Sequence, residues 1–229
     1  MKKLFLIALL TLSLFLEACG TLSNDPSSNT SYNSFSNSYN LLDYFPLDVG
    51  DKWIYKSHLH NLVFGKTILN QTYIDGKYSY IIIIYIINEE NEKEYWCKNS
   101  TGIYFYDKYC GWIQIAPATM NIGNNYSYTA YCNYGTFNIK FILLGKEQIY
   151  TPAEYFDTLK LKKEIIINTN KGKILCTNYI NLAKNVGCIK ESLSCYYSTT
   201  DYLIFEKNYT LLAANITETI YGNETYLIK

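Results

Sequence analysis

The sequence has no arginine, although lysine is frequent. Arginine is the side chain that grips phosphate or carboxylate through two parallel hydrogen bonds, so this mode of anion recognition is excluded. From residue 19 onward, 18 lysines stand against 19 acidic residues, which gives a net charge near −1. This balance provides no electrostatic attraction to nucleic acid. We therefore expect no nucleic-acid partner.

Histidine is scarce as well, since the chain contains only His58 and His60. Residues two apart on a strand share one face, so the pair could contribute to a metal site, but no third ligand is evident nearby. We expect solvent-facing histidines, no metal and no cofactor.

Recognisable catalytic motifs are also missing. The sequence has no G-x-S-x-G, no H-E-x-x-H, no glycine-rich phosphate loop and no EF-hand spacing. Four glutamates surround a turn expected at residues 88–92, and paired carboxylates could serve glycoside hydrolysis or calcium binding. A solvated hairpin tip accounts for them more simply, and we predict that the protein is not an enzyme. These glutamates are Glu89, Glu90, Glu92 and Glu94.

No apolar run reaches the roughly 20 residues that a transmembrane helix needs. The run from Leu4 to Leu16 follows Lys2 and Lys3, and it has the length and flanks of a secretory signal. The next residues, up to Cys19, resemble the lipobox of bacterial lipoproteins, apart from an unusual glutamate at position 17.

Residues 1–18 are therefore predicted to be a cleaved lipoprotein signal peptide, and Cys19 is predicted to carry the lipid, with acyl chains such as palmitate. The alternative is an ordinary secretory signal cut near Ala18, which leaves Cys19 free. We expect a cell-envelope location, with the membrane reached through lipidated Cys19. In a Gram-negative organism, Gly20 at the next position would permit export to the outer membrane.

The cysteine count agrees with export. Besides Cys19 there are six cysteines, which is compatible with three disulfides in an oxidising compartment or with free buried thiols. If the turn of one predicted hairpin is centred on residues 184–185, Cys176 and Cys195 lie opposite each other, so we predict this pairing. The other four, for which we predict no pairing, are Cys97, Cys110, Cys132 and Cys188.

The chain divides into three parts. Residues 19–41 are rich in serine and asparagine, so beyond the lipidated cysteine we expect a disordered tether. Residues 42–229 are long enough for a single domain with its own core. The 25 tyrosines of the chain could form a sugar-stacking surface or could reflect codon bias in an AT-rich genome.

The sequence predicts β-strands along nearly the whole of this domain. Asp75-Gly76 predicts a type I′ hairpin turn, and the apolar run that follows, Tyr78–Ile87, predicts a central strand buried on both faces. The short gaps predict antiparallel neighbours in a meander, so the fold class is all-β, forming a partly open β-barrel or a strongly curved sheet. The expected strands are 52–64, 66–74, 77–88, 93–98, 103–109, 136–144, 156–169, 173–182, 186–191, 196–207 and 210–216.

Three segments together resemble a group of uncharacterised secreted proteins and lipoproteins of bacteria. They are YFPLDVGDKWIY at 44–55, TPAEYFDTLKLK at 151–162 and YINLAKNVGCIK at 179–190. Glu154 and Asn185 stand where the group usually has glycine. The resemblance implies a partly open antiparallel barrel, similar to lipoprotein carriers and chaperones that cup an acyl chain, and it implies no established activity.

Within these segments, Trp53 and Tyr55 share one face of a strand and are expected to be core anchors. Val186, Gly187 and Lys190 are expected to form a turn and the start of a strand. We interpret the motifs as signatures of the fold.

Two functions stay open. The first is a binding module whose β-cup holds a lipid or another apolar ligand at the membrane. The second is a structural or assembly lipoprotein that binds another envelope protein, for example through an exposed strand edge.

Overall fold

The structure is a computed structural model that describes residues 38–227 apart from positions 60, 87–90, 171 and 201. The predicted signal peptide, the predicted lipidation site Cys19 and Gly20 lie outside the described residues, as do His60, Glu89 and Glu90. Among the described residues, no helix is long and apolar enough to cross a membrane.

The described residues form antiparallel strands joined mostly by tight turns. The two short helices are both 3₁₀ turns, η1 at Leu41–Tyr44 and η2 at Glu224–Tyr226. The strands are β1 Ser38–Asn40, β2 Lys52–Ser57, β3 Val63–Ile74, β4 Lys77–Ile86, β5 Glu92–Asn99, β6 Gly102–Asp107, β7 Gly111–Pro117, β8 Thr119–Asn121, β9 Asn125–Cys132, β10 Gly135–Tyr150, β11 Tyr155–Thr169, β12 Gly172–Ala183, β13 Gly187–Tyr197, β14 Leu203–Ile216 and β15 Thr219–Gly222.

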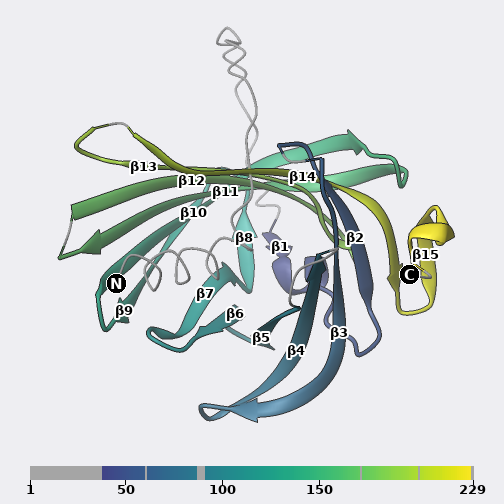
Figure 1. Ribbon diagram of the computed structural model, residues 1–229, viewed down its shortest axis with the longest axis horizontal. Helices are drawn as coiled ribbons and strands as arrows, with labels where there is room; N and C mark the ends of the chain where they lie inside the picture. The colour runs from purple at the N-terminus through teal and green to yellow at the C-terminus, as the bar shows by residue number, and fades with distance from the viewer. Residues whose placement is uncertain (1–37, 60, 87–90, 171, 201, 228–229) are drawn as a thin grey trace, which may run out of the picture.

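Two meanders meet to form one curved sheet. The strand order is β7-β6-β5-β4-β3-β2-β14-β13-β12-β11-β10-β9, so the only long-range pairing on this path joins β2 to β14. Figure 1 shows the β2–β7 half facing the β10–β14 half across the interior. The prediction of an all-β, antiparallel, partly open barrel is confirmed.

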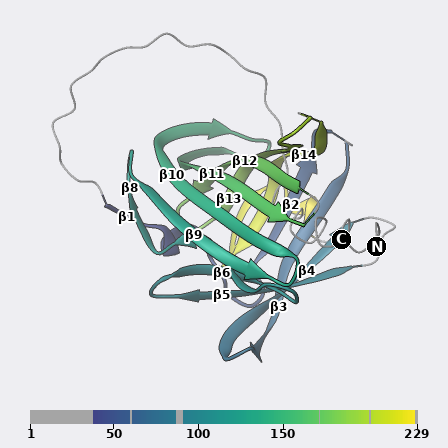
Figure 2. The same ribbon diagram turned by 90° about the vertical axis from the view of Figure 1, so that its left-hand side faces the viewer.

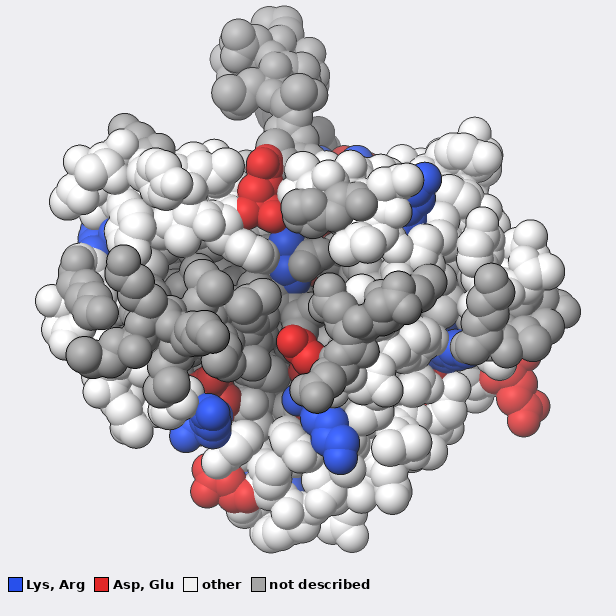
Figure 3. Space-filling view, viewed as in Figure 1, with Lys and Arg blue, Asp and Glu red and all other residues white. Residues whose placement is uncertain are grey.

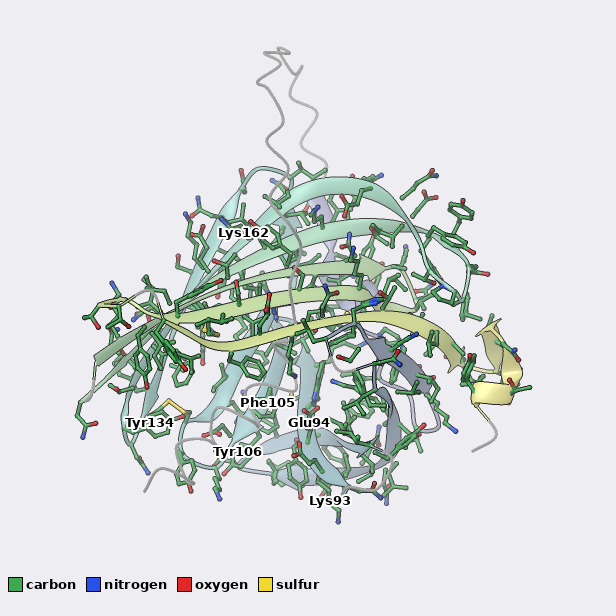
Figure 4. All side chains as sticks on the ribbon, turned by 45° about the horizontal axis from the view of Figure 1, so that its top comes forward. Lys93, Glu94, Phe105, Tyr106, Tyr134 and Lys162 are labelled. Carbon is green, nitrogen blue, oxygen red and sulfur yellow. A yellow bond between two sulfur atoms is a disulfide. The ribbon has the colours of Figure 1, made fainter. Side chains whose placement is uncertain are left out.

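The barrel has one unsealed seam, between β7 and β9, where no ladder joins the terminal strands of the sheet. A disulfide between Cys110, in the β6–β7 turn, and Cys132, at the end of β9, bridges it. Two hydrogen bonds also cross it, from Asn133 N to Tyr109 O at 3.2 Å and from the Tyr128 hydroxyl to Trp112 O at 2.9 Å. The yellow sulfur–sulfur bond near Tyr134 in Figure 4 marks this closure.

The N-terminal described segment enters the barrel as a plug, residues 38–47. Its strand β1 pairs with β8 beside the seam, as Figure 2 shows, and η1 follows inside. Leu41 and Leu47 of the plug are buried in the core. Residues 38–41 thus already pair or pack, ahead of position 42.

Alternation along the strands directs one face inward. On β11 the inward row is Leu159, Leu161, Lys163, Ile165 and Ile167, all buried. The strand predicted from the run at 78–87 is central, but only its inner face, with Ile82 and Ile84, is fully buried. Its outer face is half-exposed because the barrel has no second layer there.

The local turn chemistry follows the sequence closely. Asp75 and Gly76 both have positive φ, 43° and 75°, as the type I′ turn between β3 and β4 requires. Asn185 adopts a φ of 60° in the β12–β13 turn.

Several strand predictions were wrong. The chain does not turn between 191 and 196, because β13 runs unbroken to Tyr197. Residues 58–62 do not continue β2 but connect it to β3. The strands β7 and β9 were not expected at all, although Tyr126, Tyr128 and Ala130 of β9 alternate with polar residues.

Candidate functional site

A cavity of about 70 Å³ lies inside the barrel, between β2–β5 on one side and β11–β14 on the other. The plug forms one wall of it through Phe45, Pro46 and Leu47. Aromatic and aliphatic side chains provide most of the remaining lining, and three charged residues also reach it: Lys66, Lys163 and Glu191.

These charged residues belong to a larger group of inward-facing polar side chains, which we name the polar belt. Strand register aligns its members across the barrel wall, with Lys163 opposite Asn178 and Glu191 opposite Tyr209. On the other half of the sheet, Lys66 and Glu94 project inward from β3 and β5. The polar belt comprises Lys66, Glu94, Lys163, Asn178, Glu191 and Tyr209, and each of these residues is buried.

Lys66 and Glu94 form one half of the belt. The Lys66 ammonium lies 4.0 Å from Glu94 Oε2, and the same oxygen accepts a hydrogen bond of 3.2 Å from Trp96 Nε1. Burial raises the pKa of Glu94 to about 7, although Lys66 and Trp96 act in the opposite direction. The other carboxylate oxygen, Oε1, has no hydrogen-bond partner among the described residues.

This position contradicts the prediction that the glutamates around residues 88–92 form a solvated hairpin tip. Glu94 lies on the inward face of β5, as Figure 4 shows, whereas its neighbour Lys93 points away from the interior. The reason is the register of β5, which places Glu94 on the same face as Trp96.

Glu191 is the centre of the other half. Asn178 Nδ2 donates to Glu191 Oε1 at 2.7 Å, and the Tyr209 hydroxyl donates to Glu191 Oε2. Burial raises the pKa of Glu191, while Lys163 and these two donors act to lower it. Burial likewise raises the pKa of Tyr209 well above its usual value, so its hydroxyl keeps its proton and stays a donor.

Lys163 differs from the other belt residues in its contacts. No hydrogen bond or ion pair to its ammonium occurs among the described residues. Burial lowers the pKa of Lys163 to about 8, against the attraction of Glu191 and Cys188. Its neighbour Lys162 faces outward and pairs with Glu164 at 2.6 Å.

The first and third of the resembling sequence segments meet at the cavity. Trp53 Nε1 donates to Val186 O at 2.7 Å, and the Tyr55 hydroxyl donates to Cys188 O at 3.1 Å. Trp53 and Tyr55 are the buried anchors that the sequence predicted. Gly187 opens β13 with a φ of 97°, and a Cβ there would lie 3.4 Å from Pro46 and 3.5 Å from Trp53. These are ordinary contact distances, so the positive φ explains the glycine.

The remaining cysteines divide between disulfides and free thiols. Cys176 and Cys195 are register partners in the β12–β13 hairpin and form a disulfide. Cys97 and Cys188 are free, so a third disulfide does not form. Four strands separate β5 from β13 in the sheet, and Cys188 lines the cavity whereas Cys97 does not.

The described candidate metal ligand is not part of this site. His58 is exposed in the turn after β2, where its Nε2 lies 2.5 Å from Thr210 Oγ1. No cluster of three potential metal ligands occurs among the described residues.

Figure 3 looks into the barrel along the view of Figure 1. Acidic and basic side chains are visible along the middle of this face, and most of the other visible residues that the structure describes are uncharged.

Fold and site thus define an all-β, partly open barrel with a small apolar cavity and a charged interior. No protein-family model and no curated protein matches the chain. Among solved structures, a candidate lipoprotein from Parabacteroides distasonis is 18% identical with a TM-score of 0.41, and a candidate exported protein with a YmcC-like fold from Bacteroides fragilis is 14% identical with a TM-score of 0.39. Each comparison covers 77% of this chain and 97% of the other.

Proposed function

We propose that this protein is a lipoprotein of the cell envelope, anchored through Cys19, that binds a small molecule inside its barrel and catalyses no reaction. The observation that carries the binding role is the apolar cavity with buried charged groups at its lining. Burying ionised groups costs free energy, and a sequence that only had to fill a core could use apolar residues of similar volume. The envelope location rests on residues 1–20.

The size of the cavity restricts the ligand. An apolar cavity of about 150 Å³ in a protein core is known to hold benzene, a molecule of six carbons. The cavity here is about 70 Å³, so the long acyl chain expected for a β-cup does not fit the closed barrel. The proposed ligand therefore has only a few heavy atoms beyond the group that the belt recognises.

Native mass spectrometry on the chain extracted from its own membrane tests both parts of this proposal. We expect a diacyl or triacyl mass on Cys19, and in addition a small noncovalent mass that is released when the protein is unfolded. An unmodified Cys19 would refute the anchor. A lipidated chain that retains nothing, and that shows no binding in a small-molecule screen by the same method, would refute the binding role.

The seam favours a second candidate function, an assembly lipoprotein that binds another envelope protein. β9 is an edge strand with largely exposed side chains, including Tyr126 and Tyr131, and its free edge faces the seam. An unpaired edge can accept a strand from a partner. The substitution Thr129→Pro, on β9, should then abolish the complex with the partner protein in membrane extracts. A complex that survives this substitution would count against a contact through the strand edge.

A further inference from the structure

The donors that line the cavity show what kind of ligand it can accept. Trp53, Tyr55, Trp96 and Tyr209 each contribute a polar hydrogen, but each one is already bonded to a protein oxygen. A ligand that needs a hydrogen-bond donor cannot use these groups without breaking a buried bond.

Lys163 is the exception. Its side chain is only 4% exposed, it lines the cavity, and its ammonium has no hydrogen bond or ion pair with the residues that the structure describes. An ammonium has three donor hydrogens and no acceptor, so a buried one requires an acceptor of its own. The cavity is the space from which this acceptor can come.

The charges around the cavity favour an anionic acceptor. Two lysines and one glutamate line it, but Lys66 is paired with Glu94 at 4.0 Å, so Lys163 is the lysine of the lining that no described carboxylate pairs with. The glutamate, Glu191, accepts hydrogen bonds at both of its oxygens, from Asn178 and Tyr209, so its charge is already partly compensated. The rest of the lining is apolar and aromatic, with Ile82, Ile115 and Ile180 among the side chains.

We infer that the cavity binds a short monocarboxylate, with the carboxylate on the Lys163 ammonium and the apolar chain against the aliphatic and aromatic lining. This inference rests on the proposed binding function and specifies its ligand class. A single amino group recognises a carboxylate as a point charge, without the two-pronged geometry of arginine, so shape selection falls to the apolar lining. At less than half the volume that holds benzene, the cavity limits the chain to about one carbon beyond the carboxylate.

Calorimetric titration of the full-length mature chain in nanodiscs tests this with defined probes: sodium acetate, acetamide, ethanol and sodium octanoate. We expect saturable 1:1 binding of acetate and at least tenfold weaker binding of acetamide and ethanol. If acetamide bound as tightly as acetate, the carboxylate would be irrelevant and the inference would fail, although the proposed binding function would stand. Octanoate binding as tightly as acetate would show that the barrel opens for acyl chains, and would overturn the short-chain assignment.

Two lysine variants locate the contact. Lys163→Met keeps a long unbranched side chain and removes its charge, and should weaken acetate binding at least tenfold. Lys162→Met removes a charge from the adjacent residue on the outer face, and should leave binding unchanged. Equal losses in both variants would mean that acetate responds only to net charge and would overturn the assignment. If Lys163→Met failed to fold, Lys163→Gln and the wild-type preference for acetate over acetamide would still decide the matter.

Discussion

Removing the seam disulfide should weaken the barrel at one defined place. The Cys110–Cys132 bond closes a loop with a sequence separation of 22 residues. In the chain-entropy treatment, a loop of this size stabilises the folded state by about 3 kcal/mol, mainly by restricting the unfolded chain. For a domain of this length, that corresponds to a fall in Tm of about 10 °C. We therefore expect a Cys110→Ala, Cys132→Ala variant to melt about 10 °C below the oxidised wild type.

The second disulfide provides a matched control. Cys176–Cys195 has a sequence separation of 19 residues, so chain entropy predicts nearly the same loss, again about 3 kcal/mol. The folded states differ, however, because a continuous antiparallel ladder holds β12 to β13, whereas no ladder joins β7 to β9. The two double variants should lose similar global stability, but only the seam variant should open locally.

Amide hydrogen exchange separates these effects. Without its disulfide, the seam keeps the Asn133–Tyr109 and Tyr128–Trp112 hydrogen bonds, each worth about 1 kcal/mol net. We expect the amides of Asn133 and β9 to exchange much faster in the seam variant, and those of β12 and β13 to stay protected in the hairpin variant. Unchanged exchange at Asn133 in the seam variant would refute the reasoning, since side-chain packing alone would then close the barrel.

Further predictions concern the polar belt and the cavity wall. Wild-type stability should fall by about 3 kcal/mol between pH 4.5 and 7, because folded Glu94 keeps a proton that the unfolded chain releases, and urea unfolding of Glu94→Gln should show this loss removed. Lys163→Met should raise the Tm at pH 7 by a few degrees, because it replaces a buried ammonium that costs free energy, and a lower Tm would instead mark Lys163 as structural. Gly187→Ala and Gly76→Ala should each destabilise by about 1 to 2 kcal/mol in urea unfolding, because both glycines have positive φ and a Cβ at Gly187 would meet Pro46 and Trp53 only at ordinary contact distances.

Much of the fold follows from local sequence signals. Alternation, the Asp75-Gly76 turn and the short gaps between apolar runs lead to an antiparallel meander, and Trp53 and Tyr55 read as anchors because bulky residues two apart share a face. The edge strand β9 was not expected although Tyr126, Tyr128 and Ala130 alternate with polar residues, since an edge exposed on much of its surface carries no large aliphatic side chain. Pairing between distant strands, such as β2 with β14, has no local signal at all.

The polar belt was missed although the sequence contains a signal for it. In the segment 159–167, alternation places Lys163 in the same row as Leu159 and Leu161, and Lys162 on the opposite face. Glu94 is two residues from Trp96 in the same way. Charged residues near a predicted turn are usually solvated, so composition favoured a surface position for Glu94. Whether a side chain faces the interior depends instead on the register of its strand. A charged residue that falls into an apolar alternation is therefore a stronger indication of a site than any cluster of charges in a loop.

The belt and the resembling segments support each other at the cavity. The contacts that fix the β12–β13 turn, Trp53 to Val186 and Tyr55 to Cys188, also hold the wall of the cavity next to the plug. Residues that look like fold signatures in the sequence thus shape the cavity without touching its charges. The residues of the resembling segments shape the cavity. Lys163 lies immediately after the second segment and outside the other two, and in the proposed role it determines which ligand the cavity binds. Variation at Lys163 within an otherwise constant frame would change the ligand without changing the fold.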